Sequence, residues 1–294
     1  MDVKVVVKSN DLLGEGVMWD DQLKMLYWLD IEGRKIHTLK PETGLVKTIE
    51  TPGRVACLAP AVDGGFIIGM ETGVYRLDSG MSNFQEICIT EYLPGYRLND
   101  GKCSPGGQFF VGTIVSDSDN SKNQRTGHLY RIDPDGKCEV VLTDVTISNG
   151  LAFDELRNLF YYIDTLTHEV YCFDYDSATG SITNQRTVIR SAPEDASLDG
   201  MTIDTEGMLW IASWGGSKVM RWDPSTGVKT MEITLPTPYV TCCTFAGADM
   251  DELYITTASI ALGPKDNRIG AGDLYHVKVP AKGIPVHRFN SKTI

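Results

Sequence analysis

The sequence lacks any run of about 18 apolar residues, the length that a membrane-spanning helix requires. Its first residues, Met1-Asp-Val-Lys4, have neither the basic region nor the apolar core of a secretion signal. Basic residues are scarce, with 27 Lys and Arg against 39 Asp and Glu and a formal net charge of −12. Such an excess of negative charge argues against a nucleic-acid partner. We therefore expect a cytoplasmic protein that binds neither membranes nor nucleic acid.

Motifs typical of metal and redox sites are also missing. The seven cysteines form no Cys-x-x-Cys, and the five histidines form neither His-x-His nor His-Glu-x-x-His. Most cysteines lie in strand-like runs, so buried free thiols in a reducing compartment explain them better than a disulfide framework. The adjacent Cys242 and Cys243 leave a redox or metal pair as a less favoured alternative.

What the sequence does contain is a repeat. Residues 197–227 hold three short strand-like segments separated by turns, with Asp204-Thr-Glu-Gly207 as turn chemistry and Met208–Ala212 as a buried strand. Five other segments match this pattern, and their third strands start 38 to 55 residues apart. These third strands begin near Ile36, Val74, Leu129, Val170, Val219 and Leu274.

A repeat of this length is typical of β-propeller blades, which take about 40–50 residues for four strands. The strand Val3–Val7 has no hairpin partner, so we expect it to pair with the last repeat and remove an exposed sheet edge. The sequence therefore predicts an all-β fold: one six-bladed β-propeller domain over residues 1–294, a ring closed by the N-terminal strand. A pair of β-sandwich domains is the alternative.

Aligned on the turn, the repeats place polar side chains at one equivalent position. The aligned residues are Glu15, Cys57, Asp100, Asn149, Asp199, and Thr241 or Cys242. In a closed ring these residues would converge, and like charges at close range oppose ionisation. A divalent cation resolves that conflict, and oxygen donors favour calcium, magnesium or manganese without excluding zinc or iron(II). The alternative is that these residues only form turns.

Six short motifs stand out along the chain: Gly14-Glu15-Gly-Val-Met-Trp19, Arg97-Leu-Asn-Asp-Gly101, Ser148-Asn-Gly-Leu151, Tyr161-Tyr-Ile-Asp164, Asp199-Gly-Met201 and Ala271-Gly272. Together they resemble the senescence marker protein, gluconolactonase and luciferin-regenerating enzyme family, to which regucalcin belongs, with the bacterial sugar lactonases as the nearest branch. The resemblance implies a six-bladed propeller and hydrolysis of aldonolactones, the cyclic esters of sugar acids.

The resemblance also assigns roles to residues. It implies that Glu15, Asn149 and Asp199 bind one divalent metal, and that Arg97 and Asn99 contact the substrate. Asp100 matches a family position beside the metal. Lys122, in the polar loop 116–126, lies nearest the position of a substrate-contacting Glu in the family, which leaves the sugar unassigned. For Arg97, an ion pair with Asp100 or Asp117 is the alternative.

The chemistry follows from these roles. A divalent cation polarises the lactone carbonyl and acidifies water, and Asp199 is the candidate general base. Arg97 would stabilise developing negative charge. We expect a sugar lactonase, a carboxylic ester hydrolase acting on gluconolactone or a pentonolactone, as a monomer or weak homo-oligomer. The alternatives are an arylesterase or phosphotriesterase on the same fold, and a non-catalytic calcium-binding regulatory protein.

Overall fold

The computed structural model describes residues 1–89, 95–115, 125–263 and 269–291. Within these ranges the elements are β-strands, apart from two short 3-10 turns at Thr165–Thr167 and Pro193–Asp195. No helix in this part of the chain is long and apolar enough to cross a membrane.

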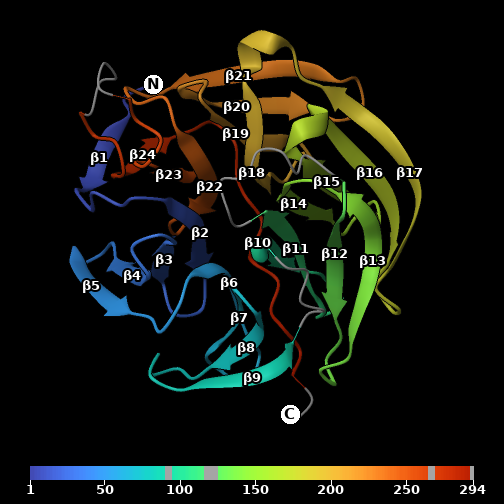
Figure 1. The fold of residues 1–294 in the computed structure, drawn as a ribbon. Helices are drawn as coiled ribbons and strands as arrows, with labels where there is room; N and C mark the ends of the chain where they lie inside the picture. The colour runs from blue at the N-terminus through green and yellow to red at the C-terminus, as the bar shows by residue number, and fades with distance from the viewer. Residues whose placement is uncertain (90–94, 116–124, 264–268, 292–294) are drawn as a thin grey trace. The chain divides into compact units, whose positions relative to one another are not determined.

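The strands form six four-stranded sheets, called blades here, and Figure 1 labels the strands. Blade 1 holds β2 (Gly14–Asp20), β3 (Met25–Asp30), β4 (Lys35–Lys40) and β5 (Leu45–Glu50). Blade 2 holds β6 (Val55–Pro60), β7 (Phe66–Met70), β8 (Gly73–Leu77) and β9 (Phe84–Ile89). Blade 3 holds β10 (Tyr96–Cys103), β11 (Phe109–Val115), β12 (Gly127–Ile132) and β13 (Cys138–Val145).

The second half of the chain continues the pattern. Blade 4 holds β14 (Ser148–Asp154), β15 (Leu159–Asp164), β16 (Glu169–Asp176) and β17 (Ser181–Arg190). Blade 5 holds β18 (Ser197–Ile203), β19 (Leu209–Trp214), β20 (Lys218–Asp223) and β21 (Val228–Thr234). Blade 6 holds β22 (Val240–Ala246), β23 (Glu252–Thr257) and β24 (Leu274–Lys278), with β1 (Lys4–Val7) as its fourth strand.

The N-terminal strand completes the last blade, as the sequence predicts. β1 runs antiparallel to β24, with Lys4 opposite His276 and Val5 opposite Tyr275 (Figure 1). The edge of β24 is thereby paired, which removes a row of open backbone donors and acceptors.

The blades belong to two compact units. Unit 1 comprises residues 1–54 and 187–285, and unit 2 comprises residues 55–186 and 286–294. In unit 2 the first strand of blade 3, β10, contacts the first strands β6 and β14 of its two neighbours. In unit 1 the first strand β22 contacts β18 and β2 in the same way. Within each unit, therefore, first strands from three blades lie next to one another. The prediction of a single domain over residues 1–294 stays a prediction.

Burial changes across each blade. The second strands are buried along nearly their whole length, as in Leu26–Leu29 of β3, whereas β5 at the far edge of the same blade is mostly exposed. Apolar clusters fill the space between blades, for example Phe110 of blade 3 against Phe153 of blade 4, with ring centroids 5.4 Å apart. Since both faces of a second strand are covered, its sequence is a continuous apolar run rather than an alternation.

The predicted repeat agrees with the observed strands. Each third strand begins within two residues of its predicted start, from Lys35 in blade 1 to Leu274 in blade 6. The predicted Asp204–Gly207 turn is also present: the Gly207 amide donates to the Asp204 carbonyl over 2.9 Å, and Gly207 has a φ of 84°.

The Asp204 side chain holds blade 5 together. This carboxylate accepts hydrogen bonds from Trp210 Nε1 at 2.9 Å and Arg221 Nε at 2.8 Å, and Asp204 is 2% exposed. Asp204→Ala would leave a buried indole N–H and a guanidinium without this partner, so we expect a loss of about 3–5 kcal/mol in the free energy of unfolding.

Glu206→Ala is the matched control, because Glu206 also pairs with Arg221 but its side chain is 65% exposed. An exposed pair contributes about 0–1 kcal/mol. Urea unfolding of both variants measures the difference. Equal losses would show that the buried network does not carry the stability of this blade.

Candidate functional site

A β-bulge interrupts the first strand of every blade at or next to the aligned positions. The irregular register falls between Glu15 and Met18, Val55 and Cys57, Leu98 and Gly101, Asn149 and Leu151, Leu198 and Met201, and Val240 and Cys242. A bulge inserts one unpaired residue and redirects a side chain, and bulges are frequent beside active sites. The aligned residues therefore lie at the bulge or directly beside it in all six blades.

The glycines that follow the acidic residues have a packing role. A Cβ on Gly200 would lie 2.7 Å from Cys242 Sγ and 2.8 Å from the Thr241 carbonyl oxygen. A Cβ on Gly101 would lie 2.8 Å from Cys57 Sγ. Only glycine lets the first strands of neighbouring blades approach this closely.

In unit 2 a chain of hydrogen bonds joins three of the predicted residues. Arg97 Nη1 donates to Asn99 Oδ1 over 2.7 Å and to the Leu98 carbonyl over 2.9 Å. Asn99 Nδ2 donates to Asn149 Oδ1 over 3.0 Å and to the Ser148 carbonyl over 2.8 Å. Asn149 and Arg97 are 7% and 8% exposed, so this chain is largely shielded from solvent.

Thr165 completes this chain and was not foreseen from the sequence. Asn149 Nδ2 donates to Thr165 Oγ1 over 2.8 Å. The two contacts of Asn149 fix its carboxamide, with the nitrogen toward Thr165 and the oxygen toward Asn99. A carboxamide oxygen has two lone pairs, and the bond from Asn99 uses one of them.

Asp100 lies beside this chain in a partly buried position. Burial raises the pKa of its carboxyl group, and the Lys102 charge and a 2.7 Å hydrogen bond from the Gly101 amide oppose that rise. Cys57, at the equivalent position of blade 2, has a thiol pKa raised by burial and by the nearby Asp100 charge. A negative charge at Asp100 is thus poorly solvated, which favours a cation or a proton nearby.

Unit 1 carries the other two predicted metal ligands, on both sides of β22. Asp199 lies in β18 and is 6% exposed, and Glu15 lies in β2, where its Oε2 accepts a 2.7 Å hydrogen bond from the Gly16 amide. Thr241 of β22 donates to the Gly14 carbonyl over 2.6 Å, which ties β22 to the strand that carries Glu15.

Two of the sequence-based assignments stay predictions, the substrate contact by Lys122 and the binding of a metal. Lys122 lies outside the described residues. Among the residues that are described, no group of three or more His, Cys, Asp and Glu side chains is arranged to hold a metal ion. A site with three or more side-chain ligands built from the described residues would therefore need a carboxamide or other neutral oxygen among them.

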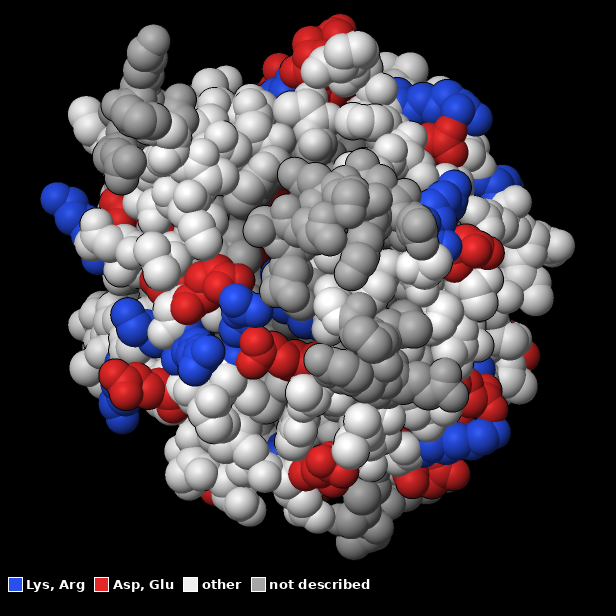
Figure 2. Space-filling model, viewed as in Figure 1, with Lys and Arg blue, Asp and Glu red and all other residues white. Residues whose placement is uncertain are grey.

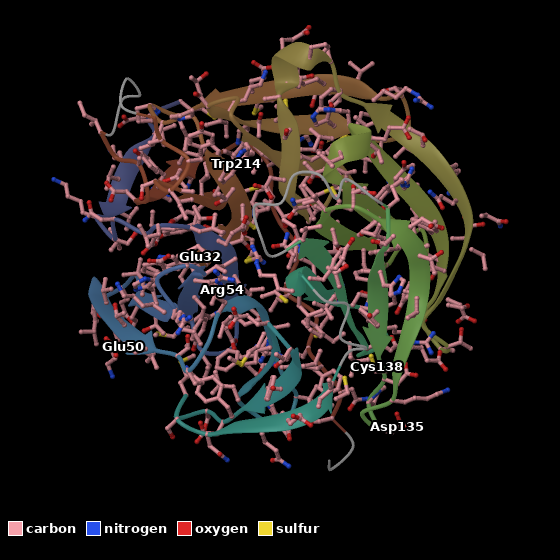
Figure 3. The ribbon with its side chains drawn as sticks, viewed as in Figure 1. Glu32, Glu50, Arg54, Asp135, Cys138 and Trp214 are labelled. Atoms are coloured by element: carbon pink, nitrogen blue, oxygen red, sulfur yellow. The ribbon has the colours of Figure 1, made fainter. Side chains whose placement is uncertain are left out.

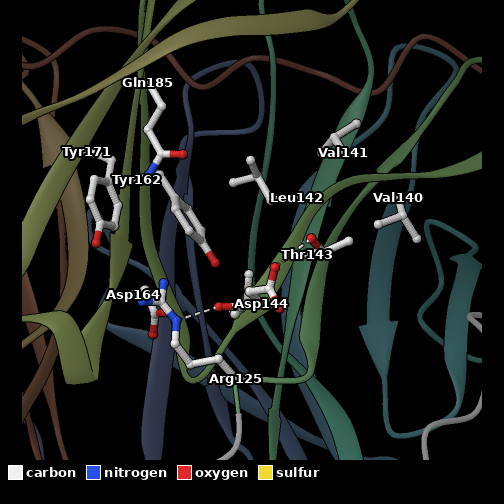
Figure 4. Close-up of a pocket in the computed structure, with 11 residues that line it drawn as sticks. Arg125, Val140, Val141, Leu142, Thr143, Asp144, Tyr162, Asp164, Tyr171 and Gln185 are labelled. Atoms are coloured by element: carbon white, nitrogen blue, oxygen red, sulfur yellow. Dashed lines mark hydrogen bonds and ion pairs between the residues drawn. The ribbon is translucent and has the colours of Figure 1, made fainter.

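Unit 2 also contains a pocket of about 550 Å³ that borders β13 and blade 4 (Figure 4). Arg125 Nε donates to the Asp144 carbonyl at its rim over 2.8 Å, and Asp164 accepts the Thr146 and Ile147 amides at 3.1 and 3.0 Å. Its described lining includes none of the residues predicted from the sequence. We therefore do not count it as part of the candidate site.

The negative net charge is not gathered in one place on the face that Figure 2 draws. Acidic and basic side chains are interspersed there. Many of them form ion pairs, such as Arg54 Nη2 with Glu32 Oε2 at 3.0 Å, two residues that lie together in Figure 3. On this face the charged side chains are therefore ordinary solvated surface.

Comparison with known proteins gives consistent matches over nearly the whole chain. The chain is 35% identical to "Putative sugar lactone lactonase YvrE" of Bacillus subtilis over 96% of its length and 97% of that protein. Its structure resembles luciferin-regenerating enzyme with a TM-score of 0.92 and 28% identity, covering 98% of this chain and 99% of the other.

A second solved structure, described as a calcium-binding protein, regucalcin, from Agrobacterium tumefaciens, matches with a TM-score of 0.90 and 25% identity over 98% of this chain and 97% of that one. With the six four-stranded blades, these likenesses confirm the predicted six-bladed β-propeller.

The family model described as "SMP-30/Gluconolactonase/LRE-like region" matches residues 13–259, which include every blade's first strand and all the predicted site residues. The chain belongs to this family, as the sequence motifs predict.

Proposed function

We propose that this protein hydrolyses a sugar lactone to the open aldonic acid with the help of one divalent cation. Two findings support the proposal: membership of the gluconolactonase family and likeness to a sugar lactone lactonase. The observation that carries it is the repeated bulge, which puts Glu15, Asn149 and Asp199 in equivalent positions of their blades. We further propose that the protein is cytoplasmic and acts as a monomer or a weak homo-oligomer.

The proposed metal ligands are Glu15, Asn149 and Asp199. The donor set fits a cation that prefers oxygen, because it offers two carboxylates and a carboxamide oxygen that keeps one lone pair. Calcium, magnesium, manganese, zinc and iron(II) all accept such ligands. When bound, such an ion polarises the lactone carbonyl and makes water more acidic.

The remaining roles belong to side chains of this chain. A carboxylate oxygen of Asp199 takes the proton of the attacking water as general base. Arg97 stabilises negative charge that develops on the lactone oxygen. Asn99 uses both of its N–H donors on Ser148 and Asn149, so toward a sugar it acts only as an acceptor through Oδ1. Lys122 is proposed to contact the substrate, and Asp100 is proposed to lie beside the metal.

The calcium-binding relative favours a second candidate function, a calcium-binding protein without lactonase activity. A panel of gluconolactone and pentonolactones followed by a pH indicator, set beside a calcium-binding isotherm, separates the two. Fast turnover with weak calcium binding supports the enzyme, and tight calcium binding without turnover supports the second candidate. Aryl esters and phosphotriesters in the same panel test the other hydrolase classes.

Replacing the proposed base should abolish hydrolysis without unfolding the protein. For Asp199→Asn we expect kcat/KM on the best lactone to fall by roughly 10³-fold, since general base catalysis contributes about 10²–10⁴. Asp223→Asn in the same blade is the control and should keep its activity. Wild-type turnover by Asp199→Asn, with a normal melting temperature for both variants, would remove Asp199 from the mechanism.

Removing divalent ions should silence the enzyme. We expect exhaustive chelation to abolish turnover and calcium, magnesium, manganese, zinc or iron(II) to restore it to different extents. Calorimetry supplies an independent readout: the stripped protein should bind the best ion with one site, and Glu15→Gln should lose that heat. Full activity in stripped protein with no bound metal would contradict the proposal.

Asn99 should act on metal affinity through Asn149. Without the Asn99 donor, the Asn149 carboxamide loses one of its two fixing bonds. We expect Asn99→Ala to weaken metal binding by about 10–100-fold, the usual effect of removing a group that orients a ligand. Asn290→Ala, an exposed asparagine, is the control. Unchanged metal affinity in Asn99→Ala would show that Asn149 is held without it, or does not bind the ion.

A further inference from the structure

Two half-buried cysteines lie on the fourth strands of blades 2 and 3, both in unit 2. Cys88 is in β9 opposite Val74, and Cys138 is the first residue of β13 opposite Ile132 (Figure 3 labels Cys138). Their partial exposure distinguishes them from the other five cysteines, which are buried.

The two side chains pack against one apolar cluster. This cluster contains Val74 and Ile132, the cross-strand neighbours of Cys88 and Cys138, together with Phe109 and Val111 of β11. Both side chains therefore pack at the layer between blades 2 and 3, and the two thiols are close enough there for a hydrogen bond between them to shift both of their pKa values.

The hydrogen bond makes the two thiols unequal. It lowers the pKa of Cys88 below the ordinary thiol value, although partial burial opposes this, and it raises the pKa of Cys138. Among the buried cysteines, burial raises the thiol pKa of Cys103, and that of Cys172 to about 11. Because the thiolate is the reactive form, Cys88 should react before these buried thiols.

We propose that Cys88 and Cys138 form an oxidation site that closes a reversible disulfide between the fourth strands of blades 2 and 3. The oxidant is a small disulfide such as oxidised glutathione. The Cys88 thiolate attacks one sulfur of the small disulfide, forms a mixed disulfide and expels one small thiolate. Cys138, after losing its proton to solvent, attacks the Cys88 sulfur and expels the second.

The exchange is balanced in atoms and electrons. Two protein thiols are oxidised to one disulfide, the small disulfide is reduced to two thiols, and the two protons end on those thiols. The new bond joins positions 88 and 138, which belong to different sheets, so no backbone ladder links them. Closing such a long loop restricts the unfolded chain and should stabilise the folded one.

Peptide mapping of the full-length protein tests the site. Reduced protein is exposed to increasing oxidised glutathione, its free thiols are alkylated, and a non-reducing digest is analysed by mass spectrometry. We expect a peptide that links Cys88 to Cys138 at oxidant levels that leave the five buried thiols reduced. A reducing agent should reverse it, and the oxidised protein should melt about 5 °C higher.

Three variants sharpen the result. Cys138→Ser should trap glutathione on Cys88, Cys88→Ser should give neither product, and Cys172→Ser should behave as wild type. Loss of both the linked peptide and the melting shift in the first two variants, with both retained in the third, supports the proposal. A wild-type protein that stops at glutathione on Cys88, or that links other cysteines first, overturns it. Lactonase activity is not a readout here, so failure of the proposed function leaves this test intact.

Discussion

The repeated bulge in the first strands is the constraint on which the rest of the site depends. Side chains in a regular strand alternate between faces, so Asp199 and Met201 would lie on one face of β18. The bulge between Leu198 and Met201 adds one residue, so Leu198, Met201 and Ile203 can share one face of β18 while Asp199, although also buried, need not lie on that face. The same short strand can therefore supply apolar side chains to the core and a polar side chain to the candidate site, because the two kinds of side chain do not have to point in the same direction. Glycine after the bulge is required because the neighbouring first strand leaves no space for a Cβ.

In unit 2 this geometry is fixed by hydrogen bonds that begin in two blades. Asn99 of β10 reaches across to Asn149 of β14, and Thr165, which directly follows β15, holds the other side of the same carboxamide. Asn149 itself lies opposite Ile163, and Thr165 follows the Ser148–Asp164 pair, close enough for its Oγ1 to accept from Asn149 Nδ2. A carboxamide held at both ends presents its oxygen in one direction. A residue that binds a cation needs such a fixed oxygen, whereas a residue that only forms a turn does not.

Much of the fold could be predicted because each blade repeats the same local pattern. The apolar run of each second strand and the turn at Asp204–Gly207 are properties of short segments. The strand Val3–Val7 has no hairpin partner, so pairing with the last blade was the natural expectation. The aligned polar residues could also be found, since the repeat gives their spacing. The bulge was not predicted, although Gly200 inside the apolar run of Ser197–Ile203 is a signal that could have indicated it. Thr165 was missed because its role depends on strand register, not on a motif of its own.

The cysteines show that the sequence predicts burial in strands, whereas the exposure and the neighbours of each thiol depend on how the blades pack. Most of the seven were expected to be buried in strands, and five are buried. Cys88 and Cys138 differ because fourth strands are the least covered of each blade, so their inward side chains are shielded on one side only. Their meeting depends on how blade 3 stacks on blade 2 across the cluster around Phe109 and Val111. First strands hold neighbouring blades together by close backbone contact, and at the fourth strands of these two blades the thiol pair is a direct link between sheets that share no backbone ladder.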